Sequence, residues 1–124
     1  MYKKHLTIAA FLGALSVLLG AFAAHTLKDH LEPQSLTTFE TGVRYQFYHV
    51  FALALAGILY KEYPNKKLVS AGNLFILGII FFSGSLYLLS FFGAQFAWIG
   101  AITPIGGVFF ILGWGQLGLG ILKK

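Results

Sequence analysis

The stretch that decides how this chain folds reads ETGVRYQFYH over residues 40–49 and continues as VFALALAGILY over residues 50–60. A polar head therefore runs directly into an apolar tail. The tail can cross a bilayer only if Arg44, Gln46 and His49 enter with it, and such side chains are costly in hydrocarbon. We expect polar groups from the rest of the chain to hold these three residues inside the membrane.

The composition indicates an integral membrane protein with one domain, residues 1–124. Of the 124 residues, 57% are hydrophobic and only 10% are charged, well below the charged share of about 25% in soluble domains. The net charge of +5 does not indicate nucleic-acid binding, because most basic residues sit in small groups beside apolar runs, as membrane orientation requires. The absence of cysteine excludes disulfides, thiol catalysis and cysteine-held metal clusters.

Apolar runs and loop signals predict an all-α fold, a four-span transmembrane helix bundle made of two hairpins. The predicted spans cover residues of about 6–24, 43–60, 68–90 and 97–122. The first has no charged residue, and about 20 residues at ~1.5 Å each cross a hydrocarbon core of ~30 Å. A secretory signal peptide is the alternative for this run, but the run exceeds the ~7–15 residues of a signal core. The second helix should begin near Pro33 and lie at the interface over residues 33–42.

The distribution of Lys and Arg predicts the orientation in the membrane. One side would carry Lys3, Lys4, Lys61, Lys66, Lys67, Lys123 and Lys124. The other side would carry Lys28 and Arg44. Because Lys and Arg concentrate on the cytoplasmic side, this bias predicts that both termini are cytoplasmic. We expect a multi-pass protein of the cell (plasma) membrane.

In this orientation, polar residues of all four spans should meet at one depth in the outer half of the bundle. The predicted cluster comprises His25, Arg44, Tyr45, Gln46, His49, Ser83, Ser85, Tyr87 and Thr103. The polar arc of the second helix should face the bundle, and its apolar arc, which includes Val43 and Val50, should face lipid. Glu40 precedes Arg44 by four residues, the spacing of an intrahelical ion pair.

Each member of this cluster also has a purely structural interpretation. Arg44 near the interface would equally suit snorkelling to the headgroups. For His49, a hydrogen bond to a serine or a backbone carbonyl is favoured over ligand binding or proton transfer. Serines in spans more often bond the backbone or aid packing than act as nucleophiles. We therefore favour a cluster that locks the helices together, with a small-ligand or lipid site as the alternative.

Small residues and one proline predict how the helices approach one another. The glycines of the predicted packing faces are Gly13, Gly20, Gly106, Gly113 and Gly120. Such faces let helices come close, and we expect them to support a homo-oligomer. Pro104 should kink the fourth span.

Five short motifs resemble those of one protein family. They are GAFAAH (residues 20–25), RYQ followed by a histidine (residues 44–46 and 49), FSGSLY (residues 82–87), ITPIGG (residues 102–107) and GW (residues 113–114). In this order they are similar to the transmembrane protein 256 family, or domain of unknown function 423, of YwdK/YgdD-like small integral membrane proteins. The resemblance covers nearly the whole chain and implies a four-span membrane protein without an established activity or catalytic residues. Ala23 stands where the family pattern has glycine, which relaxes helix packing there.

The sequence favours a non-enzymatic membrane protein, an interaction partner or a lipid- or small-ligand-binding protein, with the lipid bilayer as its partner and no cofactor or metal. A small transporter or channel subunit acting as an oligomer is the alternative, weakened because the acidic residues lie in loops or near interfaces. A bis-histidine haem site would use His25 and His49, but it lacks a supporting carboxylate. Hydrolysis at Ser83 or Ser85 lacks the context of a nucleophile elbow.

Overall fold

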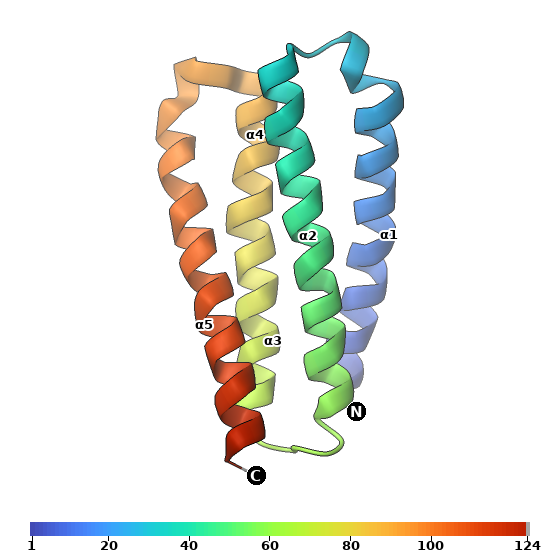
Figure 1. Cartoon of the computed structure of the whole chain (residues 1–124), viewed down its shortest axis with the longest axis vertical. Helices are drawn as coiled ribbons and strands as arrows, with labels where there is room; N and C mark the ends of the chain where they lie inside the picture. Colours follow the sequence, from blue (N-terminus) through green and yellow to red (C-terminus); the bar gives the residue numbers. More distant parts are fainter. Residues whose placement is uncertain (124) are drawn as a thin grey trace.

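The computed structural model describes residues 1–123, and the side chains of all of these except residues 94, 95 and 97. The described residues form helices joined by short connections, without a strand (Figure 1). The first elements are α1 (Lys3–His25), the short 3₁₀-helix η1 (Leu27–Asp29) and α2 (Pro33–Leu59). Pro33 suits the first turn of α2, because N–H groups there have no partner within the helix.

The third long helix is continuous over residues 66–92 but changes its winding in the middle. It consists of α3 (Lys66–Gly78), a π-helical turn η2 (Ile79–Ser83) and α4 (Gly84–Phe92). At this turn the N–H of Gly84 donates to the carbonyl of Ile79, so the turn holds one residue more than an α-helical turn. Gly93 ends α4 with a φ of 66°, which glycine adopts without steric cost.

The last long helix begins close to a proline. A 3₁₀-helical segment η3 (Gly93–Ala101) leads into α5 (Ile102–Leu122). Pro104 is therefore the third residue of α5, where its missing N–H costs no helical hydrogen bond. The proline helps to start this helix and does not kink the middle of a span.

The long helices lie side by side in the order α1, α2, α3–α4 and α5, and neighbouring helices run antiparallel (Figure 1). Both ends of the chain lie at the same end of the bundle, which we call the terminal end. In this row, α2 packs against α1 on one side and against α3 and α4 on the other. Three helical stretches, Lys3–Asp29, Lys66–Phe92 and Trp98–Leu122, are long and apolar enough to cross a membrane. Helix α2 falls outside this group, because its first half carries the polar head of residues 40–49.

Glycines bring α5 close to the third long helix in a repeating pattern. The contacts pair Gly106 with Phe82, Gly113 with Phe75 and Gly120 with Leu68. A Cβ on any of these glycines would overlap its partner residue, so the helices meet at a distance that only glycine permits. Both sets of residues repeat every seven positions and run in opposite directions. These three glycines are therefore buried within one chain, in contact with a neighbouring helix.

Helix α1 packs on α2 through two further glycines. A Cβ on Gly13 or Gly20 would lie 3.6 Å from a methyl group of Val50 or Val43 respectively, an ordinary contact distance. Both valines are buried. Val43 and Val50 thus contact α1 instead of the predicted lipid, because α2 lies inside the row and has neighbours on both sides, whereas Ile58 of the same predicted arc is 53% exposed.

Candidate functional site

Gln46 is the residue that joins three helices in the interior. Its side chain is only 1% exposed. The Nε2 amide donates to the carbonyl of Leu12 in α1 at 3.2 Å, and Oε1 accepts from the hydroxyl of Tyr87 in α4 at 2.6 Å. The Leu12 carbonyl also accepts from the Ser16 hydroxyl of its own helix at 2.8 Å. One glutamine thus bridges α1 and α4 through α2.

A second hydrogen bond ties α2 to the third long helix beside Gln46. The fully buried Ser83 hydroxyl donates to the carbonyl of Gly42 at 2.7 Å. A Cβ on Gly42 would overlap the Tyr87 ring, so glycine is required for this close approach. We call Gly42, Gln46, Ser83 and Tyr87 the Gln46 cluster.

Two hydroxyl groups connect α4 to the beginning of α5. The Ser85 hydroxyl donates to the carbonyl of Phe82 at 2.8 Å, and it also contacts the hydroxyl of Thr103. A hydroxyl has one proton to donate, so Thr103 is the donor in the second bond. Both hydroxyls serve to join helices.

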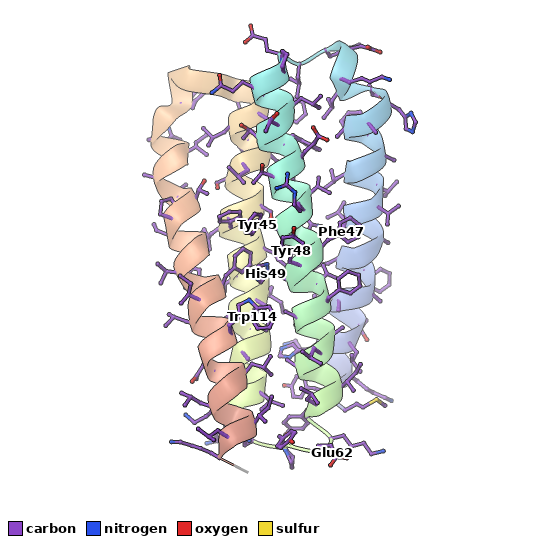
Figure 2. All side chains as sticks on the ribbon, viewed as in Figure 1. Tyr45, Phe47, Tyr48, His49, Glu62 and Trp114 are labelled. Atoms are coloured by element: carbon purple, nitrogen blue, oxygen red, sulfur yellow. The ribbon has the colours of Figure 1, made fainter. Side chains whose placement is uncertain are left out.

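His49 occupies the centre of the bundle with both ring nitrogens engaged. Nδ1 donates to the carbonyl of Tyr45 at 2.7 Å, and Nε2 accepts from the indole N–H of Trp114 in α5 at 3.2 Å (Figure 2). A carbonyl only accepts and an indole N–H only donates, so these bonds fix the neutral tautomer with its proton on Nδ1. The ring also stacks on Phe110, with centroids 3.4 Å apart. While these bonds hold, His49 has no lone pair for a metal or haem iron.

Two predicted members of the cluster, His25 and Arg44, lie elsewhere. His25 is exposed at the end of α1, and Arg44 and Tyr48 are exposed on α2. Positions 44 and 48 are one helical turn apart and share a face, on the side away from the Gln46 cluster. Tyr45 is half-buried, and its ring lies 4.8 Å from that of Phe82. The predicted haem pair of His25 and His49 is not brought together.

Arg44 instead lines a groove between α1 and α2, together with Gly20, Ala23, Glu40 and Val43. We call this the Arg44 groove. Its two charged residues form no ion pair with each other in the described part of the chain, although their spacing of four residues had predicted one.

Further buried polar contacts near the terminal end were not singled out from the sequence. His5 is 1% exposed and bonds Asn73 at 2.9 Å. The Asn65 amide donates to the Gly120 carbonyl at 3.1 Å, and Gln116 donates to Ser70 at 3.2 Å. The signal that could have found the first pair is a histidine at the start of an apolar helical run.

The interior polar groups are matched to one another. Among residues 1–123, every buried side-chain nitrogen and oxygen has a hydrogen-bond partner, and no group of three or more His, Cys, Asp or Glu side chains is placed to hold a metal ion. Buried groups of this kind are costly when unpaired. The arrangement therefore holds helices together.

Comparison with known proteins agrees with the sequence motifs. The chain matches the family described as "protein of unknown function (DUF423)" over residues 19–107. It is 40% identical to a UPF0382 membrane protein of Haemophilus influenzae, over 100% of this chain and 98% of the relative. It is also 40% identical to the UPF0382 membrane protein YwdK of Bacillus subtilis, over 90% of each chain.

The Escherichia coli relative, the UPF0382 inner membrane protein YgdD, is 31% identical over 95% of this chain and 88% of its own length. No solved structure matches the chain. The resemblance inferred from the five motifs is thus confirmed by a family match over most of the chain and by relatives aligned along nearly their full length. The chain belongs to the DUF423 family of membrane proteins.

Proposed function

We propose that this protein is a non-enzymatic, four-span membrane protein that acts by binding a lipid or a partner at its lipid-facing surface. The observation that carries the proposal is the complete pairing of the buried polar side chains in the described residues. Gln46 and His49 use their polar atoms on other helices or on their own backbone. A reactant in the interior would have to break these bonds, whereas a ligand at the surface would not.

The proposed fourth span is α2. It runs beside the other long helices along their length (Figure 1), and its 27 residues at ~1.5 Å each extend about 40 Å, more than a hydrocarbon core of ~30 Å. Its buried polar groups are paired within the bundle, which lowers the cost of placing them in a membrane.

The proposed orientation places both termini in the cytoplasm, in the plasma membrane of the cell. Lys3, Lys4, Lys61, Lys66, Lys67 and Lys123 lie toward the terminal end, and basic residues favour the cytoplasmic side. The predicted contribution of Lys124 lies outside the described residues.

The orientation can be tested with single cysteines, because the natural chain has none. In intact cells, a membrane-impermeant maleimide should label Lys28→Cys and should label Lys61→Cys only after permeabilisation. The reverse pattern would overturn the proposed orientation, and labelling of both in intact cells would place them on the same side.

The binding function can be tested by native mass spectrometry of protein extracted from its own membranes in mild detergent. We expect lipid or a protein partner to remain bound. Arg44→Ala, at an exposed position, should accumulate normally with altered binding, whereas His49→Ala should accumulate less because it removes an interior contact. Protein recovered alone under conditions that preserve lipid on a known lipid-binding membrane protein would refute the proposal.

Transport receives less support from the arrangement of charges. The acidic residues of the chain are Asp29, Glu32, Glu40 and Glu62. None lies in the Gln46 cluster, where a proton or cation pathway through the bundle would use one. An ion flux in liposomes that depends on the protein would favour transport over the proposed function.

A further inference from the structure

The Arg44 groove combines an apolar floor with a charged rim. Its volume is about 190 Å³, and it lies between the last turns of α1 and the first half of α2. Ala23 and Val43 are buried in its floor, and Gly20 leaves room beside them. The rim is formed by Glu40 and Arg44, both exposed.

The two rim charges are opposite but not joined. In the described part of the chain, neither Glu40 nor Arg44 forms an ion pair, although one helical turn separates them. Each is therefore available to a ligand group of opposite charge. A ligand that carries one positive and one negative group at a similar separation would satisfy both.

In the proposed four-span arrangement, the groove lies just inside the level where lipid headgroups meet acyl chains. Arg44 is 11 residues from the start of α2 at Pro33, or about 16 Å at ~1.5 Å per residue. Because α2 exceeds a hydrocarbon core by about 10 Å, a long arginine side chain at this depth can reach the headgroup region. Glu40 lies one turn nearer the end of the helix, further toward water.

We propose that the Arg44 groove binds the zwitterionic headgroup of an ethanolamine phospholipid. The planar guanidinium of Arg44 would hold the phosphate through two N–H donors. The carboxylate of Glu40 would accept N–H bonds from the ammonium group. In such a lipid the ammonium lies further from the acyl chains than the phosphate does, and Glu40 lies further from the membrane centre than Arg44. The order of charges on α2 therefore matches the order in the headgroup.

Other common headgroups fit this rim less well. An anionic glycerol headgroup would place its phosphate beside Arg44 but would leave Glu40 without a positive partner. A choline headgroup has a positive charge but no N–H to donate, so its contact with Glu40 lacks hydrogen bonds. The combination of Glu40 and Arg44 thus distinguishes ethanolamine from both.

This inference rests on the proposed surface-binding function and can be tested with reconstituted full-length protein. Native mass spectrometry would measure the binding of phosphatidylethanolamine, phosphatidylglycerol and phosphatidylcholine offered in equal amounts. We expect phosphatidylethanolamine to be preferred. Arg44→Gln should weaken binding of all three lipids by about tenfold, because it removes a charge-assisted contact to the shared phosphate. Glu40→Gln should remove the preference for ethanolamine and leave phosphatidylglycerol binding unchanged or stronger.

A charge-exchanged variant provides the sharpest comparison. The double substitution Glu40→Arg and Arg44→Glu keeps the net charge and the helix but reverses the order of the charges. It should lose the ethanolamine preference as completely as Glu40→Gln does. Lys28→Gln, an exposed charge change on η1 outside the groove, is the control and should bind lipid as the natural protein does. Thermal unfolding of each variant shows that the fold is retained.

The outcomes separate this inference from the proposed function. Lipid or partner binding that is insensitive to both groove residues would overturn the inference and leave surface binding standing. An ethanolamine preference that survives the charge exchange would overturn it as well. Complete absence of bound lipid and of any partner would overturn both. Displacement of the lipid by equimolar soluble phosphoethanolamine would refute a lipid as the occupant.

Discussion

Replacing Gln46 by leucine tests whether the Gln46 cluster holds three helices together. The substitution keeps a side chain of similar size but removes the hydrogen bonds to Leu12 and Tyr87. Interhelical hydrogen bonds in membrane proteins contribute about 0.6 kcal/mol on average and up to about 1.7 kcal/mol. The Tyr87 hydroxyl would also lose its acceptor, which costs ~1–3 kcal/mol when a polar group stays buried. We expect Gln46→Leu to lower the free energy of unfolding by about 2–4 kcal/mol.

The measurement is unfolding by sodium dodecyl sulfate in mixed micelles, followed by circular dichroism and tryptophan fluorescence. A double-mutant cycle with Tyr87→Phe isolates the glutamine–tyrosine bond. Because Tyr87→Phe removes the hydroxyl that Gln46→Leu leaves unpaired, the double variant should be more stable than the sum of the single losses predicts, by about 1 kcal/mol. Tyr48→Phe is the matched control: this tyrosine is 51% exposed, and the loss of its hydroxyl should change stability by less than about 0.5 kcal/mol.

Two results would refute this reasoning. The first is a Gln46→Leu protein that unfolds at the same detergent fraction as the natural protein. The second is strict additivity of the two losses, which would show that the side chains act independently despite the 2.6 Å between their oxygens.

Three further changes test other contacts. Gly106→Ala should destabilise the fold by about 1–3 kcal/mol, because its Cβ would overlap backbone atoms of the third long helix. The control Gly115→Ala, with nothing within 4 Å of its Cβ, should leave thermal unfolding almost unchanged. Equal effects of the two substitutions would contradict the packing of α5 on the third long helix. Trp114→Phe removes the donor to Nε2 of His49, so ¹⁵N NMR should show the Nε2 resonance shifted while the proton stays on Nδ1, and an unshifted resonance would contradict the bond. Asn73→Leu leaves a buried histidine without its partner and should cost about 1–3 kcal/mol in detergent unfolding; a variant as stable as the natural protein would argue against that pair.

The depth of the polar residues in the bundle could be predicted from the sequence, but whether each side chain points into the bundle or away from it could be predicted only in part. Antiparallel helices of known length bring Gln46, Ser83 and Tyr87 to one depth, and the structure joins them. The polar arc of α2 was broad, however, and a modest rotation of the helix decides which of its residues point inward. Gln46 and His49 point inward, while Arg44 points to the surface. Periodicity alone does not fix that rotation, because it depends on neighbours on two sides.

The glycines show the same limit in another form. Their spacing indicated faces for close helix packing, and the structure contains such faces. The partner could not be predicted, since a glycine face fits another helix of the same chain as well as a second copy of it. The partner is identified only when Gly106, Gly113 and Gly120 are matched with a second series of residues that are also seven positions apart but run in the opposite direction. In this chain that series is Phe82, Phe75 and Leu68.

The π-helical turn at Ile79–Ser83 makes the third long helix unusually tolerant of a change in length at that point. The turn holds one residue more than an α-helical turn, so removing one residue there would restore ordinary α-helical winding and leave the flanking residues on nearly the same faces. Phe75 would still face α5, and Tyr87 would still face α2. A deletion within α3 or α4 would instead rotate everything beyond it by about 100°. Gaps in alignments of related proteins that fall within the third long helix should therefore fall at this turn, and a scan of single-residue deletions should find them better tolerated there than in α3 or α4.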